Sequence, residues 1–169
     1  SVLSQAIWRG DSAFGGRRPL TLAFFTVAQS PEQTGADAAR CLRACRELAF
    51  KAGMDGMIGG QVMDLANENR SVTAEILTQT DALKTSALLE AACRMGAIVA
   101  GANENDISTA GEYAYNLGIA FQIVDDILDV TGEEKELGKP IGSDAASGKN
   151  TFVSLLTLDG AQALAQEYT

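Results

Sequence analysis

The stretch Phe121-Gln122-Ile123-Val124-Asp125-Asp126-Ile127-Leu128-Asp129 places three carboxylates and one amide in an otherwise apolar part of the chain. Positions 122, 125, 126 and 129 have the i, i+3, i+4, i+7 spacing of a single helical face. The apolar neighbours would pack into a core, so we expect this acidic stripe to face water or a polar cavity. The pattern predicts a helix over about residues 108–130 that carries a candidate cation site.

The rest of the sequence also favours an all-α fold. Apolar residues recur at helical spacing through most of the chain, and no stretch shows convincing period-2 alternation with turn dipeptides. The length suits one domain, and no internal repeat is visible, so we expect a single domain over residues 1–169. Further helices are predicted near residues 36–51, 53–67, 73–80 and 81–100, from about 151, and again after 159.

Composition excludes several classes of function. The chain has 22 acidic against 13 basic residues and a formal charge of −9, which argues against binding to nucleic acid. It has no histidine, so Ser-His-Asp triads and the usual transition-metal sites are excluded. Cys41, Cys45 and Cys93 are interpreted as reduced thiols, which favours a cytoplasmic protein. Apolar runs are too short to predict stable membrane insertion, and no signal peptide is evident.

The acidic stripe has two interpretations. The simpler one is a solvated charged face, which is common for an isolated Asp-Asp-x-x-Asp. The alternative is a Mg²⁺ site, because carboxylates one helical turn apart repel one another unless a cation is bound, and Mg²⁺ often joins carboxylates to substrate phosphates. Gln122 and two lysines in the following glycine-rich segment, Lys139 and Lys149, favour the second interpretation, since ammonium groups there could bind a diphosphate.

Two earlier predicted helices carry polar residues on faces that should be apolar. Gln61 and Asp64 lie on the first of them, and Lys84 and Thr85 interrupt the second. Buried polar groups need partners, so a shared central cavity would account for all four. Exposure to solvent is the alternative for each one taken singly.

Together these motifs resemble one family. The matching segments, in order, are Gly59-Gly60-Gln61-x-x-Asp64-Leu65, Lys84-Thr85, Phe121-Gln122-x-x-Asp125-Asp126-x-x-Asp129, Gly138-Lys139-Pro140-x-Gly142-x-Asp144 and Gly148-Lys149-Asn150-Thr151. They resemble the trans-isoprenyl diphosphate synthases, the family of farnesyl and geranylgeranyl diphosphate synthases. The similarity extends from Leu20 to Thr169 and is greatest to the bacterial farnesyl diphosphate synthases.

The resemblance implies an all-α helical bundle of the isoprenoid synthase type around a central cavity, and a homodimer. The implied activity is prenyl transfer: an allylic diphosphate, dimethylallyl or geranyl, ionises with the help of Mg²⁺ and condenses head to tail with isopentenyl diphosphate. By resemblance, Asp125, Asp126 and Asp129 would hold Mg²⁺, Lys84, Lys139 and Lys149 would bind the allylic diphosphate, and Gln61, Thr85, Phe121 and Gln122 would line or position substrate. Asp125, Lys84 and Lys139 would be the catalytic residues.

The chain also departs from the family. Nothing before Asp125 supplies the family's first aspartate-rich motif, and the domain is therefore expected to be incomplete in its N-terminal part. Either the sequence joins pieces of a longer enzyme with the segments between them left out, or it is a truncated paralogue. Gly15-Gly16-Arg17-Arg18-Pro19 resembles a basic diphosphate-binding turn, in which Arg17 and Arg18 would contact substrate. A terpene cyclase and a non-catalytic subunit of a heteromeric synthase remain as alternative functions.

Overall fold

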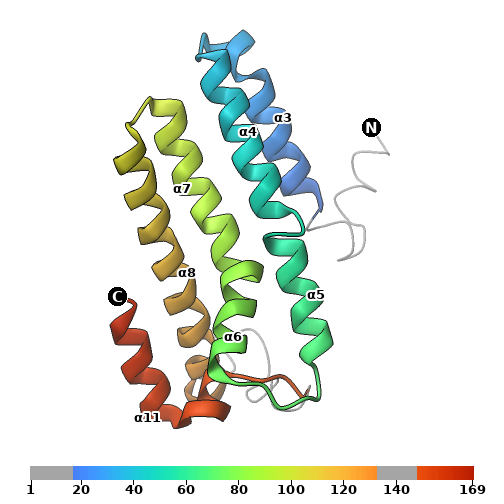
Figure 1. Ribbon diagram of the computed structural model, residues 1–169, viewed down its shortest axis with the longest axis vertical. Coiled ribbons are helices and arrows are strands. Elements are labelled where there is room, and N and C mark those ends of the chain that lie inside the picture. The colour runs from blue at the N-terminus through green and yellow to red at the C-terminus, as the bar shows by residue number, and fades with distance from the viewer. Residues whose placement is uncertain (1–16, 133–147) are drawn as a thin grey trace.

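The computed structural model describes residues 17–132 and 148–169, and the side chains of residues 17 and 18 are outside that description. Within these ranges all regular secondary structure is helical, which confirms the all-α prediction (Figure 1). The elements are α3 (Arg17–Thr34), α4 (Ala38–Ala52), α5 (Met57–Asn67), α6 (Ala74–Asp81), a π-helical turn η1 (Ala82–Ser86), α7 (Ala87–Ala100), α8 (Glu104–Thr131) and α11 (Phe152–Glu167).

The helices are arranged as antiparallel neighbours. Helices α3 and α4 form one hairpin, and α7 and α8 form a second hairpin beside it (Figure 1). Helix α6, η1 and α7 follow one another without an intervening loop and make one long rod. Helix α5 continues below α4, and α11 packs beside the C-terminal half of α8. The rod is therefore in contact with α4, α5 and α8 along its length.

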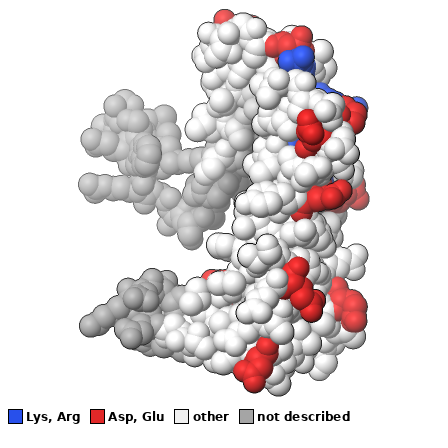
Figure 2. All heavy atoms as spheres, turned by 90° about the vertical axis from the view of Figure 1, so that its left-hand side faces the viewer, with Lys and Arg blue, Asp and Glu red and all other residues white. Residues whose placement is uncertain are grey.

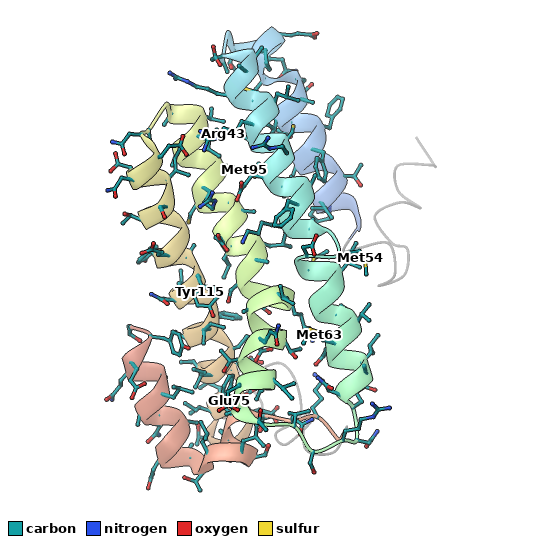
Figure 3. The ribbon with its side chains drawn as sticks, viewed as in Figure 1. Arg43, Met54, Met63, Glu75, Met95 and Tyr115 are labelled. Atoms are coloured by element: carbon teal, nitrogen blue, oxygen red, sulfur yellow. The ribbon has the colours of Figure 1, made fainter. Side chains whose placement is uncertain are left out.

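Buried apolar side chains form two clusters, one towards each end of the molecule. The first lies where α6, α8 and α11 meet, and the second lies between α4, α7 and the start of α8, with Met95 against it (Figure 3). Removal of this apolar surface from water stabilises the packing of α8 against its neighbours. The first cluster consists of Leu77, Ile119, Ile123, Phe152, Ala161 and Ala165, and the second of Ala44, Ile98 and Ile107.

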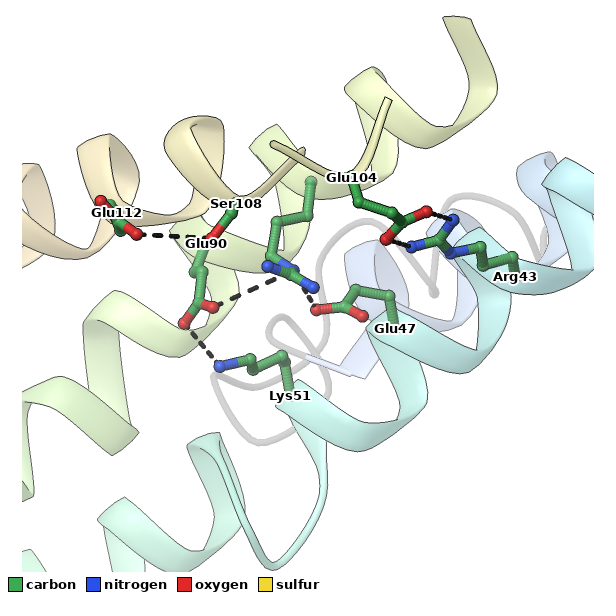
Figure 4. Close-up of polar contacts among 8 residues, drawn as sticks. Arg43, Glu47, Lys51, Glu90, Glu104, Ser108 and Glu112 are labelled. Atoms are coloured by element: carbon green, nitrogen blue, oxygen red, sulfur yellow. Dashed lines mark hydrogen bonds and ion pairs between the residues drawn. The ribbon is translucent and has the colours of Figure 1, made fainter. Parts of the chain in front are cut away.

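Ion pairs hold together the end of the molecule that contains the second cluster (Figure 4). They join α4 to α7 and to the first turn of α8, across elements that are well separated in the sequence. We call this region the ion-pair end. Its contacts are Lys51 Nζ to Glu90 Oε2 at 2.5 Å, Arg94 Nε to Glu47 Oε1 at 2.6 Å and Arg43 Nη1 to Glu104 Oε1 at 2.6 Å.

Helix α3 was not predicted from the sequence. The interpretation of Arg17-Arg18-Pro19 as a turn is wrong in its backbone, because these residues form the first turn of α3. Proline is compatible with a first helical turn, since the N–H it lacks would have no partner within the helix. The preceding glycines and the second proline, Pro31, obscured the helical pattern of the apolar residues between them.

Other helix boundaries differ by a few residues. Helix α8 begins at Glu104 rather than 108, because Asn103 caps it and accepts a hydrogen bond from Asp106 N at 2.9 Å. Helix α5 begins at Met57, after a turn over residues 53–56. The two predicted C-terminal helices are present: α11 consists of two helical segments that meet at a kink at Thr157 (φ 68°, ψ 169°).

No helix in the described ranges is both long and apolar enough to span a lipid bilayer. Figure 2 shows the side of the molecule on which α8 and α11 lie in Figure 1. Acidic side chains are spread along this face, whereas the visible lysine and arginine side chains gather near its upper end. The surface charge of this side is therefore mainly negative, as the composition predicts.

Candidate functional site

Lys84 projects from the π-helical turn η1 towards α5. Its Nζ atom lies 2.5 Å from Asp64 Oδ2, and both side chains are largely buried, with 30% and 22% exposed respectively. This ion pair is better shielded from solvent than a surface pair, and each charge compensates for the burial of the other. The structure thus brings together two of the polar residues that the sequence assigned to a shared cavity.

Thr85, the next residue of η1, projects towards α8. Its Oγ1 donates a hydrogen bond to Gln122 Oε1 at 2.9 Å, and both side chains are partly buried. Lys84 and Thr85 are therefore fixed by different neighbouring helices, one on each side of the rod. Gln61, by contrast, is exposed on α5, and Phe121 is 61% exposed on α8.

The acidic stripe is less exposed than the sequence predicted. Asp126 is 9% and Asp129 is 2% exposed, while Asp125 is partly buried. Asp126 Oδ2 accepts a hydrogen bond of 2.7 Å from Phe152 N, at the start of α11. Asp126 and Asp129 therefore do not face bulk water, and α11 packs against this part of α8. That the stripe lines a polar cavity stays a prediction.

The apolar neighbours of the stripe show the opposite error. Ile119 and Ile123 are fully buried as predicted, but Val124 is 43% and Leu128 is 42% exposed. The face of α8 that carries Val124 and Leu128 is therefore less covered by the described helices than the face that carries Ile119 and Ile123. A helix with apolar side chains on two faces can bury only the one that its neighbours cover.

Asp81 was missed as a site residue. It is 7% exposed and lies at the end of α6, three residues before Lys84. Burial, followed by the negative charges of Asp126 and Asp64, raises the pKa of Asp81 to about 7, and Lys84 and Lys149 act in the opposite direction. The available sequence signal was its i, i+3 spacing to Lys84, which places both residues on the same side of the rod.

Lys149 reaches this region through an anchored segment. Asn150 Nδ2 donates to Asn67 O at 3.1 Å and to Arg70 O at 2.9 Å, and Asn69 N donates to Gly148 O at 3.2 Å. These contacts fix residues 148–150 against the turn after α5. Lys149 then lines a small hollow together with Asp64, Asn67, Glu68, Val72, Leu77, Thr80 and Asn150.

We use the name polar cluster for Asp81 and the four charged residues that act electrostatically on it: Asp64, Lys84, Asp126 and Lys149. The cluster draws on α5, α6, η1, α8 and the segment before α11. Of the other predicted site residues, Lys139 lies outside the described residues. Arg17 and Arg18 are placed only by their backbone, at the start of α3.

The donors near the stripe suit Mg²⁺ by their chemistry, since carboxylate oxygens are the ligands this ion prefers. Within residues 17–132 and 148–169, however, no group of three acidic or other ligating side chains is close enough to hold a metal ion by itself. Mg²⁺ commonly uses one or two carboxylates and completes its shell with water and substrate phosphate. The residues present therefore fit one side of a metal–diphosphate site, not a closed protein cage.

Comparisons with known proteins show the family of this chain. The family model of polyprenyl synthetase matches residues 18–168. The chain belongs to the polyprenyl synthetase family. Among curated relatives of this family, it is 44% identical over 138 residues to the farnesyl diphosphate synthase of Bacillus subtilis, covering 82% of this chain and 47% of that protein. It is 38% identical over 159 residues to the corresponding enzyme of Geobacillus stearothermophilus, covering 94% and 51%.

A solved structure supports the same assignment to the polyprenyl synthetases. The geranyltransferase of Helicobacter pylori, complexed with magnesium and isoprenyl diphosphate, superimposes with a TM-score of 0.75 at 32% identity. The match covers 88% of this chain and 47% of that one. The chain thus spans about half the length of the relatives it matches.

Proposed function

We propose that this chain forms part of a Mg²⁺-dependent prenyltransferase that condenses isopentenyl diphosphate with dimethylallyl or geranyl diphosphate. The observation that carries the proposal is the polar cluster, in which Lys84 binds Asp64 and Lys149, from a distant part of the sequence, lines the same hollow as Asp64. Family membership supports the same activity and favours it over a terpene cyclase. A homodimer, as the resemblance implies, is part of this proposal.

The lysines suit the departure of a diphosphate. The transfer breaks the C–O bond of the allylic diphosphate, forms a C–C bond to isopentenyl diphosphate, and releases pyrophosphate and a proton. Lys84 and Lys149 supply fixed positive charge for the leaving group, and Asp64 holds the ammonium of Lys84 in place. Asp125, with Asp126 and Asp129, would hold Mg²⁺, which when bound adds positive charge beside the leaving oxygen.

Replacement of Asp125 tests this function. We expect Asp125→Ala to lower the rate of condensation at least about 100-fold, because a carboxylate that binds the metal is lost. The measurement is incorporation of labelled isopentenyl diphosphate into product, with geranyl diphosphate and MgCl₂. Asp159→Ala, which removes an exposed carboxylate on α11, is the matched control. Undiminished turnover by Asp125→Ala would refute the proposal.

A second candidate function is that of a partner subunit. Its support is a row of exposed apolar side chains along one face of α8: Leu117, Phe121, Val124 and Leu128 are 42–61% exposed. Such a row is typical of a helix that packs against another chain or segment. This candidate predicts that the chain alone neither turns over substrate nor binds pyrophosphate with Mg²⁺, but that a second synthase chain restores turnover.

A further inference from the structure

The residues that carry Lys84 and Thr85 have an unusual backbone. Residues 82–86 form a π-helical turn within an otherwise α-helical rod. Such turns are rare, and they shift the side chains that follow them relative to a regular α-helix. The directions of Lys84 and Thr85 therefore depend on how this turn is held in place.

Helix α5 approaches the turn with its backbone. A Cβ atom added at Gly60 would lie 2.6 Å from Lys84 Cα and 2.7 Å from Leu83 C, and closer still to Lys84 N. These are backbone atoms of η1, so no rotation of a side chain could relieve the overlap. One helical turn further along α5, Asp64 binds the ammonium of Lys84. The same face of α5 thus contacts both the backbone and the side chain of Lys84.

Helix α8 makes the corresponding approach from the other side. A Cβ atom at Gly118 would lie 2.7 Å from both Cα and Cβ of Ser86, and closer still to its Oγ. One turn further along α8, Gln122 accepts the hydrogen bond from Thr85. Both helices therefore contribute a glycine followed four residues later by a polar partner.

We propose that Gly60 and Gly118 are positioning residues that fix η1 between α5 and α8, so that Lys84 and Thr85 are presented to a diphosphate. The choice of a diphosphate as the ligand rests on the proposed function, whereas the contacts at Gly60 and Gly118 do not depend on it. Not every helical glycine is so closely approached: Gly96 in α7 has no atom within 4 Å of the position of an added Cβ. Gly96 is therefore a matched control for substitution by alanine.

The test compares Gly60→Ala and Gly118→Ala with Gly96→Ala in the 169-residue chain. Affinity for inorganic pyrophosphate with MgCl₂ is measured by calorimetry at a temperature at which circular dichroism shows each variant to be folded. We expect at least about tenfold weaker binding for the first two variants and less than about twofold change for Gly96→Ala. A purely structural role would lower the unfolding temperature and leave this affinity unchanged, which would overturn the inference.

Hydrogen exchange at the amides of residues 82–86 gives a second readout that needs no ligand. We expect faster exchange there in Gly60→Ala and Gly118→Ala than in Gly96→Ala, and equal rates would overturn the inference. If the wild-type chain fails to bind pyrophosphate, the proposed function is refuted, while exchange still decides the role of the glycines.

A compensating variant guards against simple misfolding. Ser86→Gly removes two of the three atoms that a Cβ at Gly118 would meet. The double variant Gly118→Ala/Ser86→Gly should therefore exchange more slowly at residues 82–86 than Gly118→Ala does, with Ser86→Gly alone as control. If the double variant exchanged as fast as Gly118→Ala at residues 82–86, positioning by close contact would be contradicted.

Discussion

The ion-pair end and the polar cluster differ in how evenly their charges are matched. At the ion-pair end, Lys51 and Arg94 meet Glu90 and Glu47 between regular α-helices, and each side chain has a partner of opposite charge. In the polar cluster, Asp81 is buried among other carboxylates, and its neighbour Lys84 stands on a π-helical turn. Perturbed ionisation and irregular backbone often mark functional sites. In the described residues, the raised pKa of Asp81 and the π-helical turn thus lie together, at the end of the rod away from the ion-pair end.

The largest effect is expected from a matched pair of lysines. Lys84 and Lys51 both form partly buried ion pairs of 2.5 Å, with Asp64 and Glu90 respectively. Lys84→Ala should weaken binding of pyrophosphate with Mg²⁺ by about 100-fold, since a charge-assisted hydrogen bond contributes roughly 2–3 kcal/mol. Lys51→Ala should change it less than about twofold. Calorimetric titration measures the affinity of both variants. Equal losses of affinity would show that general destabilisation, and not the position of Lys84 in the polar cluster, is the cause.

An intermediate effect is expected for Asp81. Its folded pKa of about 7 lies above the ordinary value of 3.8, so the folded protein binds an extra proton between these values. The free energy of unfolding should therefore fall as pH rises from about 4 to 7, and most of that loss should be absent in Asp81→Asn.

At pH 8 we expect Asp81→Asn to be more stable than wild type by on the order of 2 kcal/mol, and the two to be nearly equal at pH 4. Urea unfolding in the presence of a chelator measures both values. The carboxylates of Asp126 and Asp64 and the ammonium groups of Lys84 and Lys149 face this group. If the free energy of unfolding depended on pH in the same way in wild type and Asp81→Asn, Asp81 would not have a raised pKa, and the contrast with the ion-pair end would fail.

The smallest effect concerns two buried hydroxyls. Ser86 Oγ is the one fully buried side-chain polar atom without a hydrogen-bond partner in the described ranges, whereas Thr80 Oγ1 donates to Ile76 O at 2.8 Å. Ser86→Ala should raise the free energy of unfolding by about 1 kcal/mol, because an unpaired hydroxyl is costly to bury. Thr80→Val should not raise it. Chemical denaturation distinguishes them, and a destabilised Ser86→Ala would imply a partner for this hydroxyl.

Much of the fold followed from helical spacing in the sequence. The periodic apolar residues of α4, α7 and α8 predicted helices that the structure confirms, since these helices bury one face against a neighbour. Helix α3 was missed because its prolines and flanking glycines resemble a turn. The π-helical turn was not predictable, because its register depends on contact with two other helices at Gly60 and Gly118.

The candidate site was predictable in its residue types more than in their surroundings. Lys84, Thr85 and Gln122 were identified from the sequence. Their partners became known only from the packing: Lys84 binds Asp64, and Thr85 binds Gln122. Asp81 was missed because its i, i+3 spacing to Lys84 is a weak signal in the sequence alone, and its burial and neighbouring charges come from the packing. The roles assigned to Asp125, Gln61 and Lys139 remain predictions.

The hydrogen bond between Asp126 Oδ2 and Phe152 N ties the candidate metal-binding helix to the docking of α11. A cation that draws electron density from this carboxylate weakens it as an acceptor, and tighter docking of α11 in turn makes the carboxylate a poorer ligand. By thermodynamic reciprocity, each event opposes the other by the same free energy. Under the proposed function, docking of the C-terminal helix would therefore set cation affinity, and truncations that loosen α11 would change metal binding without removing a ligand.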